Sequence, residues 1–227
     1  MSIHHSSGFK GRYRALLFDM DGTLLNSIAA AERIWRAWAL HHGLDVESFL
    51  PTIHGARAID TVARLAIPGL DAEAEANAIT RSEIDDVVGI IEIPGAIAFL
   101  RSLPADKWAV VTSAPMALAM QRMKAAGIPV PAVMVTSEDV AIGKPHPDCY
   151  VLAAQKLGIE VADCLVFEDA HVGIRAAEAA GAKVIVVTST HAHPMETPHP
   201  SIHDYEMIVA QVDDEDFILL EERFIGT

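Results

Sequence analysis

The 227-residue chain contains little cysteine, few aromatic residues and few positive charges. Its two cysteines, Cys149 and Cys164, lie far apart without a CxxC spacing, so neither a disulfide framework nor a cysteine metal site is indicated. With 17 basic and 31 acidic side chains, the formal net charge is −14. Such a composition offers no basic footprint for nucleic acid or an anionic membrane, and we expect neither as a partner.

The sequence also lacks an apolar run of 18 residues and a recognisable secretory leader. Residues 1–11 are polar and carry two adjacent histidines, so we interpret them as a tail outside the fold. Hydrophobic residues make up 51% of the chain and the mean hydropathy is +0.27, which suffices for a large core. We expect a cytoplasmic monomer with reduced thiols.

The most informative stretch begins with four apolar residues, Ala15–Phe18, which predict a strand buried on both faces. Asp19 and Asp21 follow directly, and an extended backbone points both carboxylates to the same side. Gly22 allows a sharp turn, and the Thr23 hydroxyl can orient a carboxylate. In an open parallel sheet, ligands bind at this end of a strand.

Two carboxylates this close repel each other unless a cation lies between them or one of them is protonated. A hard divalent ion such as Mg²⁺ suits these oxygen ligands. The short motif is also compatible with an acidic β-turn that faces water, so the rest of the chain has to decide between the two interpretations.

Helical periodicity follows without a strand signal between residues 28 and 93. We therefore predict an inserted helical subdomain, residues 28–93, closed by Pro94 and Gly95, with the stripe that contains Trp35 and Trp38 packed inside it. The predicted helical segments are 28–43, 46–50, 56–66 and 72–88. The remaining α/β core would comprise residues 12–27 and 94–227.

A polar loop within this insertion, residues 52–57, contains His54, Gly55 and Arg57. The glycine permits a close approach, and the two side chains could reach an anionic or hydroxylated ligand. An ordinary helix start with a solvated arginine explains the loop equally well.

Strand and helix patterns alternate after residue 94, which predicts an α/β fold with a doubly wound parallel sheet. Near the end of the chain we expect a strand at 207–210 and a helix that begins with the acidic residues Asp213–Asp216. The expected elements between these regions are helices at 96–103, 116–126, 147–157 and 172–180, and strands at 108–112, 132–136, 164–167 and 183–187.

Polar residues with matching chemistry occur at or beyond the ends of these predicted strands. Thr112 and Ser113 close one strand, where a hydroxyl and backbone N–H groups can hold a phosphoryl oxygen. Lys144 supplies a compact positive charge, and Glu168 and Asp169 offer further oxygen ligands for a metal ion. Each signal is weak alone, but their order and positions make coincidence improbable.

Together, Asp19-Met-Asp-Gly-Thr23, Thr112, Lys144 and Glu168-Asp169 resemble the four motifs of the haloacid dehalogenase-like phosphohydrolases. The resemblance spans residues 15–181 and is to the branch with a helical cap after the first motif. Within this branch, residues 53–55 and 111–113 are similar to sugar-phosphate, 2-deoxyglucose-6-phosphate and glycerol-phosphate phosphatases. The resemblance implies a Rossmann-like core, an α-helical cap and a phosphatase that acts on small phosphorylated sugars or polyols.

The resemblance also implies roles for individual residues. Asp19 would attack phosphorus to form an aspartyl phosphate, and Asp21 would act first as acid and then as base. Mg²⁺ would be held by Asp19, the backbone carbonyl of Asp21, Asp169 and, directly or through water, Glu168. Thr112 and Lys144 would hold the phosphoryl group. The further substrate-binding candidates are Ser113, His54, Gly55 and Arg57.

The sequence departs from the family pattern at a few positions. Ala114 and Pro115 follow Ser113 where glycine is usual, and His171 lies beside the acidic pair, most simply as a helix-start residue. Four histidines near the C-terminus invite a zinc interpretation, but interleaved prolines argue against fixed ligand geometry. These histidines are His191, His193, His199 and His203.

Two other classes of function stay open at this point. A β-phosphoglucomutase-like isomerase uses the same aspartyl phosphate, but it needs a second anion site that Ala114, Pro115 and Met116 do not supply, and Ala31 stands where those enzymes carry a cap histidine. A non-catalytic phosphoacceptor module is about half this length and needs neither the insertion nor Asp21. A haloacid dehalogenase proper is disfavoured, because cleavage of a carbon–halogen bond needs neither a proton donor at Asp21 nor Mg²⁺.

Overall fold

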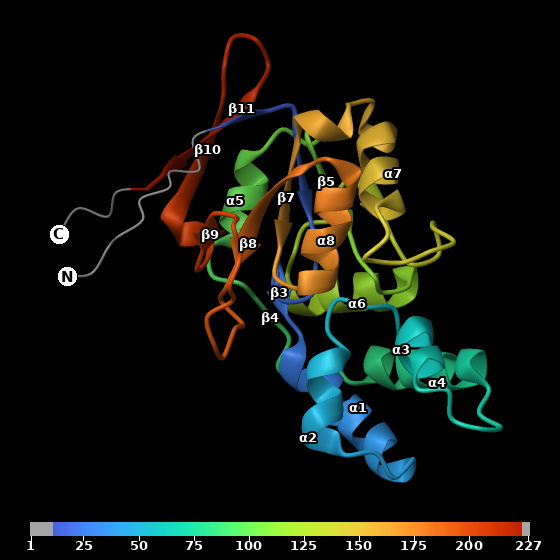
Figure 1. Ribbon diagram of the computed structural model, residues 1–227. Coiled ribbons are helices and arrows are strands. Elements are labelled where there is room, and N and C mark those ends of the chain that lie inside the picture. Colours follow the sequence, from blue (N-terminus) through green and yellow to red (C-terminus); the bar gives the residue numbers. More distant parts are fainter. Residues whose placement is uncertain (1–10, 224–227) are drawn as a thin grey trace.

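The structure is a computed structural model that describes residues 11–223, so the predicted tail, apart from Gly11, lies outside the described residues. A six-stranded, fully parallel sheet forms its centre, in the order β6-β5-β2-β7-β8-β9 (Figure 1). The strands are β2 (Ala15–Phe18), β5 (Trp108–Val111), β6 (Val133–Val135), β7 (Cys164–Glu168), β8 (Lys183–Val187) and β9 (Ser201–Ile202). The predicted doubly wound α/β fold is therefore confirmed.

Strand β2 lies in the middle of the sheet because all four of its residues are apolar and can be buried from both sides. Leu16 and Phe18 pack with α5 and α6 on one face, whereas Ala15 and Leu17 pack with α7 and α8 on the other. The covering helices are α5 (Ala96–Ser102), α6 (Met116–Ala126), α7 (Asp148–Leu157) and α8 (His171–Ala180).

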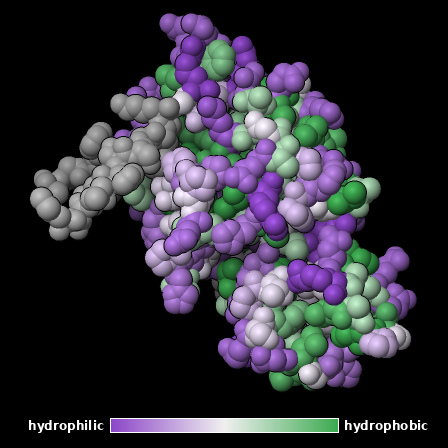
Figure 2. All heavy atoms as spheres, viewed as in Figure 1, coloured by the Kyte–Doolittle hydropathy of each residue, from purple (hydrophilic) through white to green (hydrophobic). Residues whose placement is uncertain are grey.

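A helical layer lies beyond the carboxyl ends of the strands, where Figure 2 shows it as a smaller lobe below the sheet-containing part. It has its own apolar cluster around Trp35, Trp38 and Phe49, so the prediction that the two tryptophans pack inside it is confirmed. Its elements are α1 (Ile28–His41), α2 (Val46–Phe49), the 3₁₀ turn η1 (Leu50–Thr52), α3 (Ala58–Arg64) and α4 (Ala72–Asp85).

The expectation of an uninterrupted helical insertion was wrong at its end. Strand β3 (Leu25–Asn26) pairs antiparallel with β4 (Ile91–Glu92), so a short ribbon connects the layer to the core. Two-residue strands are too short to show a period in the sequence. Helix α4 also ends earlier than predicted, because the Asp86 carboxylate accepts hydrogen bonds from the Arg33 side chain and from the Val88 N–H.

The expectation of a helix starting at Asp213 was also wrong. Strands β10 (Ile208–Val212) and β11 (Ile218–Glu222) form a hairpin, and β1 (Arg12–Tyr13) joins it in a second, antiparallel sheet. The Asp213 carboxylate accepts hydrogen bonds from the N–H groups of Glu215 and Phe217, which stabilises a turn instead of a helix. The 3₁₀ turns η2 (Val161–Asp163) and η3 (Tyr205–Met207) complete the described elements. None of the helices among residues 11–223 is long and apolar enough to cross a membrane.

Candidate active site

Asp19 lies directly after β2 and is only 4% exposed. Its carboxylate contacts Lys144, whose Nζ donates hydrogen bonds to Asp19 Oδ1 at 2.7 Å and to Glu168 Oε1 at 2.7 Å. The same ammonium donates to the Val111 carbonyl oxygen at 3.2 Å. Because these contacts come from the ends of three adjacent strands and the loop before α7, residues far apart in sequence meet at one buried point.

Glu168 and Asp169, the second pair of acidic residues in the site, are also fixed by hydrogen bonds. Glu168 Oε2 accepts hydrogen bonds from the N–H groups of Asp169 and Ala170, both at 2.9 Å. Asp169 Oδ1 accepts a hydrogen bond from the Thr23 hydroxyl at 3.1 Å. The sequence analysis predicted that this hydroxyl can orient a carboxylate. Gly22, at a φ of 87°, lies so close to the Asp169 carboxylate that a Cβ would collide with it.

This cluster fits a hard divalent cation. Asp19, Glu168 and Asp169 can present three carboxylate oxygens that all lie within 4.8 Å of one another, and all three side chains are buried. Burial, opposed by Lys144 and reinforced by Glu168, raises the pKa of Asp19 to about 8. Burial and the neighbouring carboxylates raise the pKa of Asp169 well above its usual value. A bound cation would relieve both effects, because it compensates the desolvated negative charge.

Lys144 stays positively charged in this setting. Burial by itself lowers its pKa, but the adjacent charges of Asp19 and Glu168 outweigh this effect and raise the pKa well above its usual value. The single charge of the Lys144 ammonium cannot balance the charges of three carboxylates, so the cluster can bind a further cation.

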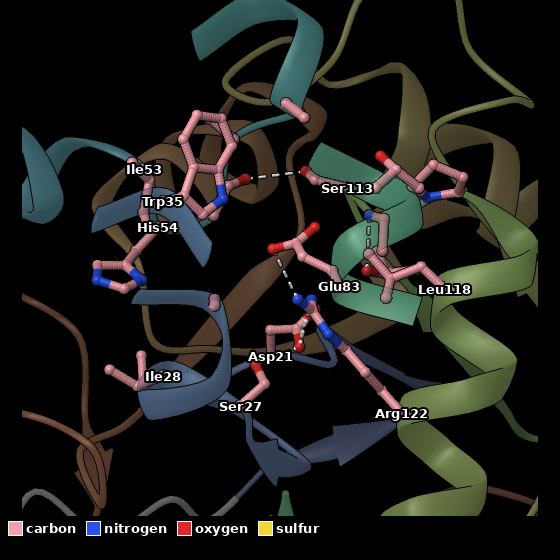
Figure 3. A pocket seen from close by; sticks show the side chains of 18 of the residues that line it. Asp21, Ser27, Ile28, Trp35, Ile53, His54, Glu83, Ser113, Leu118 and Arg122 are labelled. Carbon is pink, nitrogen blue, oxygen red and sulfur yellow. Dashed lines mark hydrogen bonds and ion pairs between the residues drawn. The ribbon is translucent and has the colours of Figure 1, made fainter. Parts of the chain in front are cut away.

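A cleft lies between the helical layer and the core (Figure 3). It reaches the buried cluster at Asp19, whereas Lys144, Glu168 and Asp169 do not line it. Asp19 and Asp21 both line it, as predicted from their spacing, together with Thr112 and Ser113. The Thr112 hydroxyl accepts a hydrogen bond from the Ala114 N–H at 3.0 Å. Four of the polar residues that the sequence placed at strand ends, Asp19, Asp21, Thr112 and Ser113, therefore share one cavity.

The Asp21 carboxylate contacts the side chains of Ser27 and Arg122. Ser27 Oγ donates a hydrogen bond to Asp21 Oδ1 at 2.5 Å, and Arg122 Nη1 lies 3.0 Å from the same oxygen. Both contacts involve Oδ1, and no hydrogen bond from a described residue reaches Oδ2. The second oxygen is therefore the one available to a ligand.

The sequence analysis missed Arg122 and its partner Glu83. Arg122 Nη2 donates a hydrogen bond to Glu83 Oε1 at 3.0 Å, which joins α6 of the core to α4 of the helical layer. Burial raises the pKa of Glu83, and the Arg122 charge opposes that rise. The sequence did contain a signal for both residues, because each is a charged residue on an otherwise apolar helix face. Glu83 lies near Ile79 in α4, and Arg122 is adjacent to Met123 in α6.

The candidate substrate-binding residues of the loop at 52–57 lie in two different environments. His54 and Gly55 line the cleft, and the His54 ring lies 3.3 Å from the Glu32 carboxylate. The Arg57 guanidinium instead contacts Asp60 through two hydrogen bonds of 2.6 and 2.8 Å, and it also donates to backbone carbonyls at 140 and 141. It is not among the residues that line the cleft, so a contact between Arg57 and substrate stays a prediction.

The histidines that the sequence singled out lie in different environments. His171 is exposed at the first turn of α8. The His191 ring lies 2.9 Å from the Asp169 carbonyl oxygen, whereas the His199 ring lies 2.8 Å from the Glu178 carboxylate. Within residues 11–223, the group of carboxylate, histidine or cysteine side chains that is compact enough for a metal ion is Asp19, Glu168 and Asp169.

The fold and the cleft define an α/β enzyme with a buried, carboxylate-rich site at the carboxyl ends of parallel strands. A model of the haloacid dehalogenase-like hydrolases matches residues 13–181. The chain belongs to this family, which confirms the resemblance identified from its four motifs.

Relatives and solved structures agree with this assignment. Hexitol phosphatase A of Escherichia coli (strain K12) is 43% identical over 82% of this chain and 87% of its own length. Glycerol-1-phosphate phosphohydrolase 2 of Saccharomyces cerevisiae is 35% identical over 79% of this chain and 76% of its own. The crystal structure of a hydrolase from Pseudomonas syringae superposes with a TM-score of 0.70 at 27% identity, covering 78% of this chain and 85% of that one.

Proposed function

We propose that this protein is a Mg²⁺-dependent phosphatase that hydrolyses small phosphorylated sugars or polyols through an aspartyl phosphate on Asp19. The observation that carries the proposal is the contact of Lys144 with both Asp19 and Glu168, beside a cleft that Asp19 and Asp21 line. The names of the relatives, a hexitol phosphatase and a glycerol-1-phosphate phosphohydrolase, support the substrate class.

In the first half of the reaction, a carboxylate oxygen of Asp19 attacks phosphorus and the bond between phosphorus and the leaving oxygen breaks. Asp21 gives its proton to that oxygen, so the product leaves as a neutral alcohol. In the second half, Asp21 takes a proton from water, which attacks phosphorus and releases inorganic phosphate. Asp19 is regenerated as a carboxylate, and the proton count is restored.

The remaining residues position and neutralise the phosphoryl group. Lys144 carries a fixed positive charge beside Asp19, and the Thr112 hydroxyl and the Ser113 backbone N–H provide donors at the same end of the sheet. Asp19, Glu168 and Asp169, with the backbone of Asp21, would hold Mg²⁺. When bound, the ion would neutralise charge on the phosphoryl oxygens.

We also propose a division of labour within the chain. Residues 12–27 and 94–227 would form the catalytic core, and residues 28–93 would act as a cap that excludes water and contacts the alcohol part of the substrate. The separate apolar cluster of the helical layer and the short β3–β4 ribbon support this division. The two free, buried cysteines are compatible with a reducing compartment such as the cytoplasm.

The experiment that tests this function is a screen of the purified protein, with Mg²⁺, against a panel of phosphorylated sugars and polyols that includes β-glucose 1-phosphate. We expect release of inorganic phosphate from hexose and polyol phosphates. Formation of glucose 6-phosphate that outpaces phosphate release would instead identify a mutase. Absence of phosphate release from every ester would refute the proposal.

A further inference from the structure

A buried chain of ion pairs connects the helical layer to the core beside Asp21 (Figure 3). The Arg122 guanidinium lies between two carboxylates, 3.0 Å from Asp21 Oδ1 and 3.0 Å from Glu83 Oε1. Glu83 and Arg122 are each 6% exposed, and both line the cleft that leads to Asp19. The mechanism above uses Asp21 and leaves the other two residues without a role.

The pair has hydrogen-bonding capacity that the protein does not satisfy. The Nε atom of Arg122 is buried and has no hydrogen-bond partner among the described residues. Glu83 uses Oε1 for Arg122, and Figure 3 shows its second oxygen directed away from Arg122 into the cleft. A buried donor without a partner is costly, so the arrangement points to a ligand that completes it. A hydroxyl group can both accept from a guanidinium and donate to a carboxylate.

The charges indicate which ligand fits. The single positive charge of Arg122 faces the two carboxylates of Asp21 and Glu83, so this part of the cleft has no positive charge to spare. A second phosphate or a carboxylate on the substrate would find no unpaired positive charge and would approach the Glu83 carboxylate, which disfavours its binding. Trp35 and Leu118, which also line the cleft, suit the carbon skeleton of a neutral polyol.

Building on the proposed function, we propose that Glu83, held by Arg122, is the residue that determines specificity at this site. Its carboxylate accepts a hydrogen bond from a hydroxyl group of the substrate alcohol. The pair thereby selects monophosphates of uncharged polyols over phosphate esters that carry a second anionic group.

The test compares two substrates of equal carbon number, glycerol 3-phosphate and 3-phosphoglycerate, which differ in whether the far end is a hydroxymethyl group or a carboxylate. We expect wild-type kcat/KM to favour the neutral ester by roughly tenfold or more. Glu83→Gln keeps the side-chain shape but removes a negative charge, so the preference should shrink by about tenfold. A wild-type enzyme without preference, or an unchanged ratio in Glu83→Gln, would overturn the proposal.

The matched control is Asp86→Asn, the same change of acid to amide three residues further along. Asp86 pairs with Arg33 at 3.0 and 2.8 Å and does not line the cleft, so its substrate ratio should stay at the wild-type value. Because a ratio of kcat/KM values does not depend on the fraction of active enzyme, partial unfolding of a variant does not obscure the comparison.

If Glu83→Gln does not fold, competition in the wild-type enzyme supplies the answer. Glycerol 3-phosphate should inhibit hydrolysis of p-nitrophenyl phosphate at a concentration roughly tenfold lower than 3-phosphoglycerate. Equal inhibition by the two esters would overturn the specificity proposal while leaving the phosphatase function intact. Failure of the enzyme to hydrolyse any ester would count against the function instead.

Discussion

Ser113 Oγ donates a hydrogen bond to the Gly55 carbonyl oxygen at 2.8 Å, and this contact joins the end of a core strand to the helical layer. Gly55 adopts a φ of 75°, and a Cβ there would lie 2.7 Å from Ala170 Cβ and 2.8 Å from a methyl carbon of Val172. The layer can therefore approach the start of α8 only because this residue has no side chain.

We predict that Gly55→Ala impairs closure of the cleft. The added methyl group should push the loop away from α8 and lower kcat/KM for sugar phosphates by roughly tenfold to a hundredfold. Gly43→Ala is the matched control, since Gly43 has a φ of 67° but open space around its Cβ position. Both variants should lose about 1 to 2 kcal/mol of stability to backbone strain, but only Gly55→Ala should lose activity. Equal activity losses would show that strain, not contact, is responsible.

Asp19→Asn should abolish turnover, because an amide is a poor nucleophile and a poor metal ligand. Phosphate release from p-nitrophenyl phosphate should fall to the background rate. The wild-type enzyme in EDTA should lose activity in the same way and regain it when Mg²⁺ is restored. Activity that persists in the variant or in EDTA would contradict the assignment of the nucleophile or of the metal.

Asp21→Asn should slow the hydrolysis of sugar phosphates by roughly 10²-fold or more, because the amide can neither donate nor accept the catalytic proton. The loss should be smaller for p-nitrophenyl phosphate, whose leaving group departs without protonation. Stabilisation by Mg²⁺ in a thermal-shift assay should persist, since the expected ligand at this position is the backbone carbonyl. Near wild-type turnover of an unactivated sugar phosphate would refute the acid–base role.

The raised pKa of Asp19, about 8, predicts a pH dependence for the metal-free protein. Between the ordinary carboxyl pKa of about 4 and this value, the folded state binds more protons than the unfolded state, so stability falls as pH rises. Mg²⁺ competes with the proton on Asp19, so stabilisation by the metal should grow over the same window. Melting temperatures at pH 5.5 and 8, with and without Mg²⁺, measure both effects. Metal stabilisation that is identical at the two pH values would contradict the prediction.

The sequence alone was sufficient for the class of fold and the chemical centre of the site. Apolar strands that end in Asp19, Thr112 and Glu168 predict where polar groups emerge, because the carboxyl ends of parallel strands lie at one edge. Such signals depend on local periodicity and on residue type, which a single chain displays directly. The two-residue strands β3 and β4 and the C-terminal hairpin escaped this reasoning, since their structure depends on pairing partners.

Only the tertiary structure decided how the helical layer meets the core. Arg57, the cation singled out from the loop, is paired with Asp60, whereas Arg122 reaches the cleft from a core helix and meets Glu83 from the layer. The two partners are 39 positions apart, and neither belongs to a recognisable motif. The packing of α4 against α6 is what brings them together, because long-range proximity is a property of the packed helices and not of either segment alone.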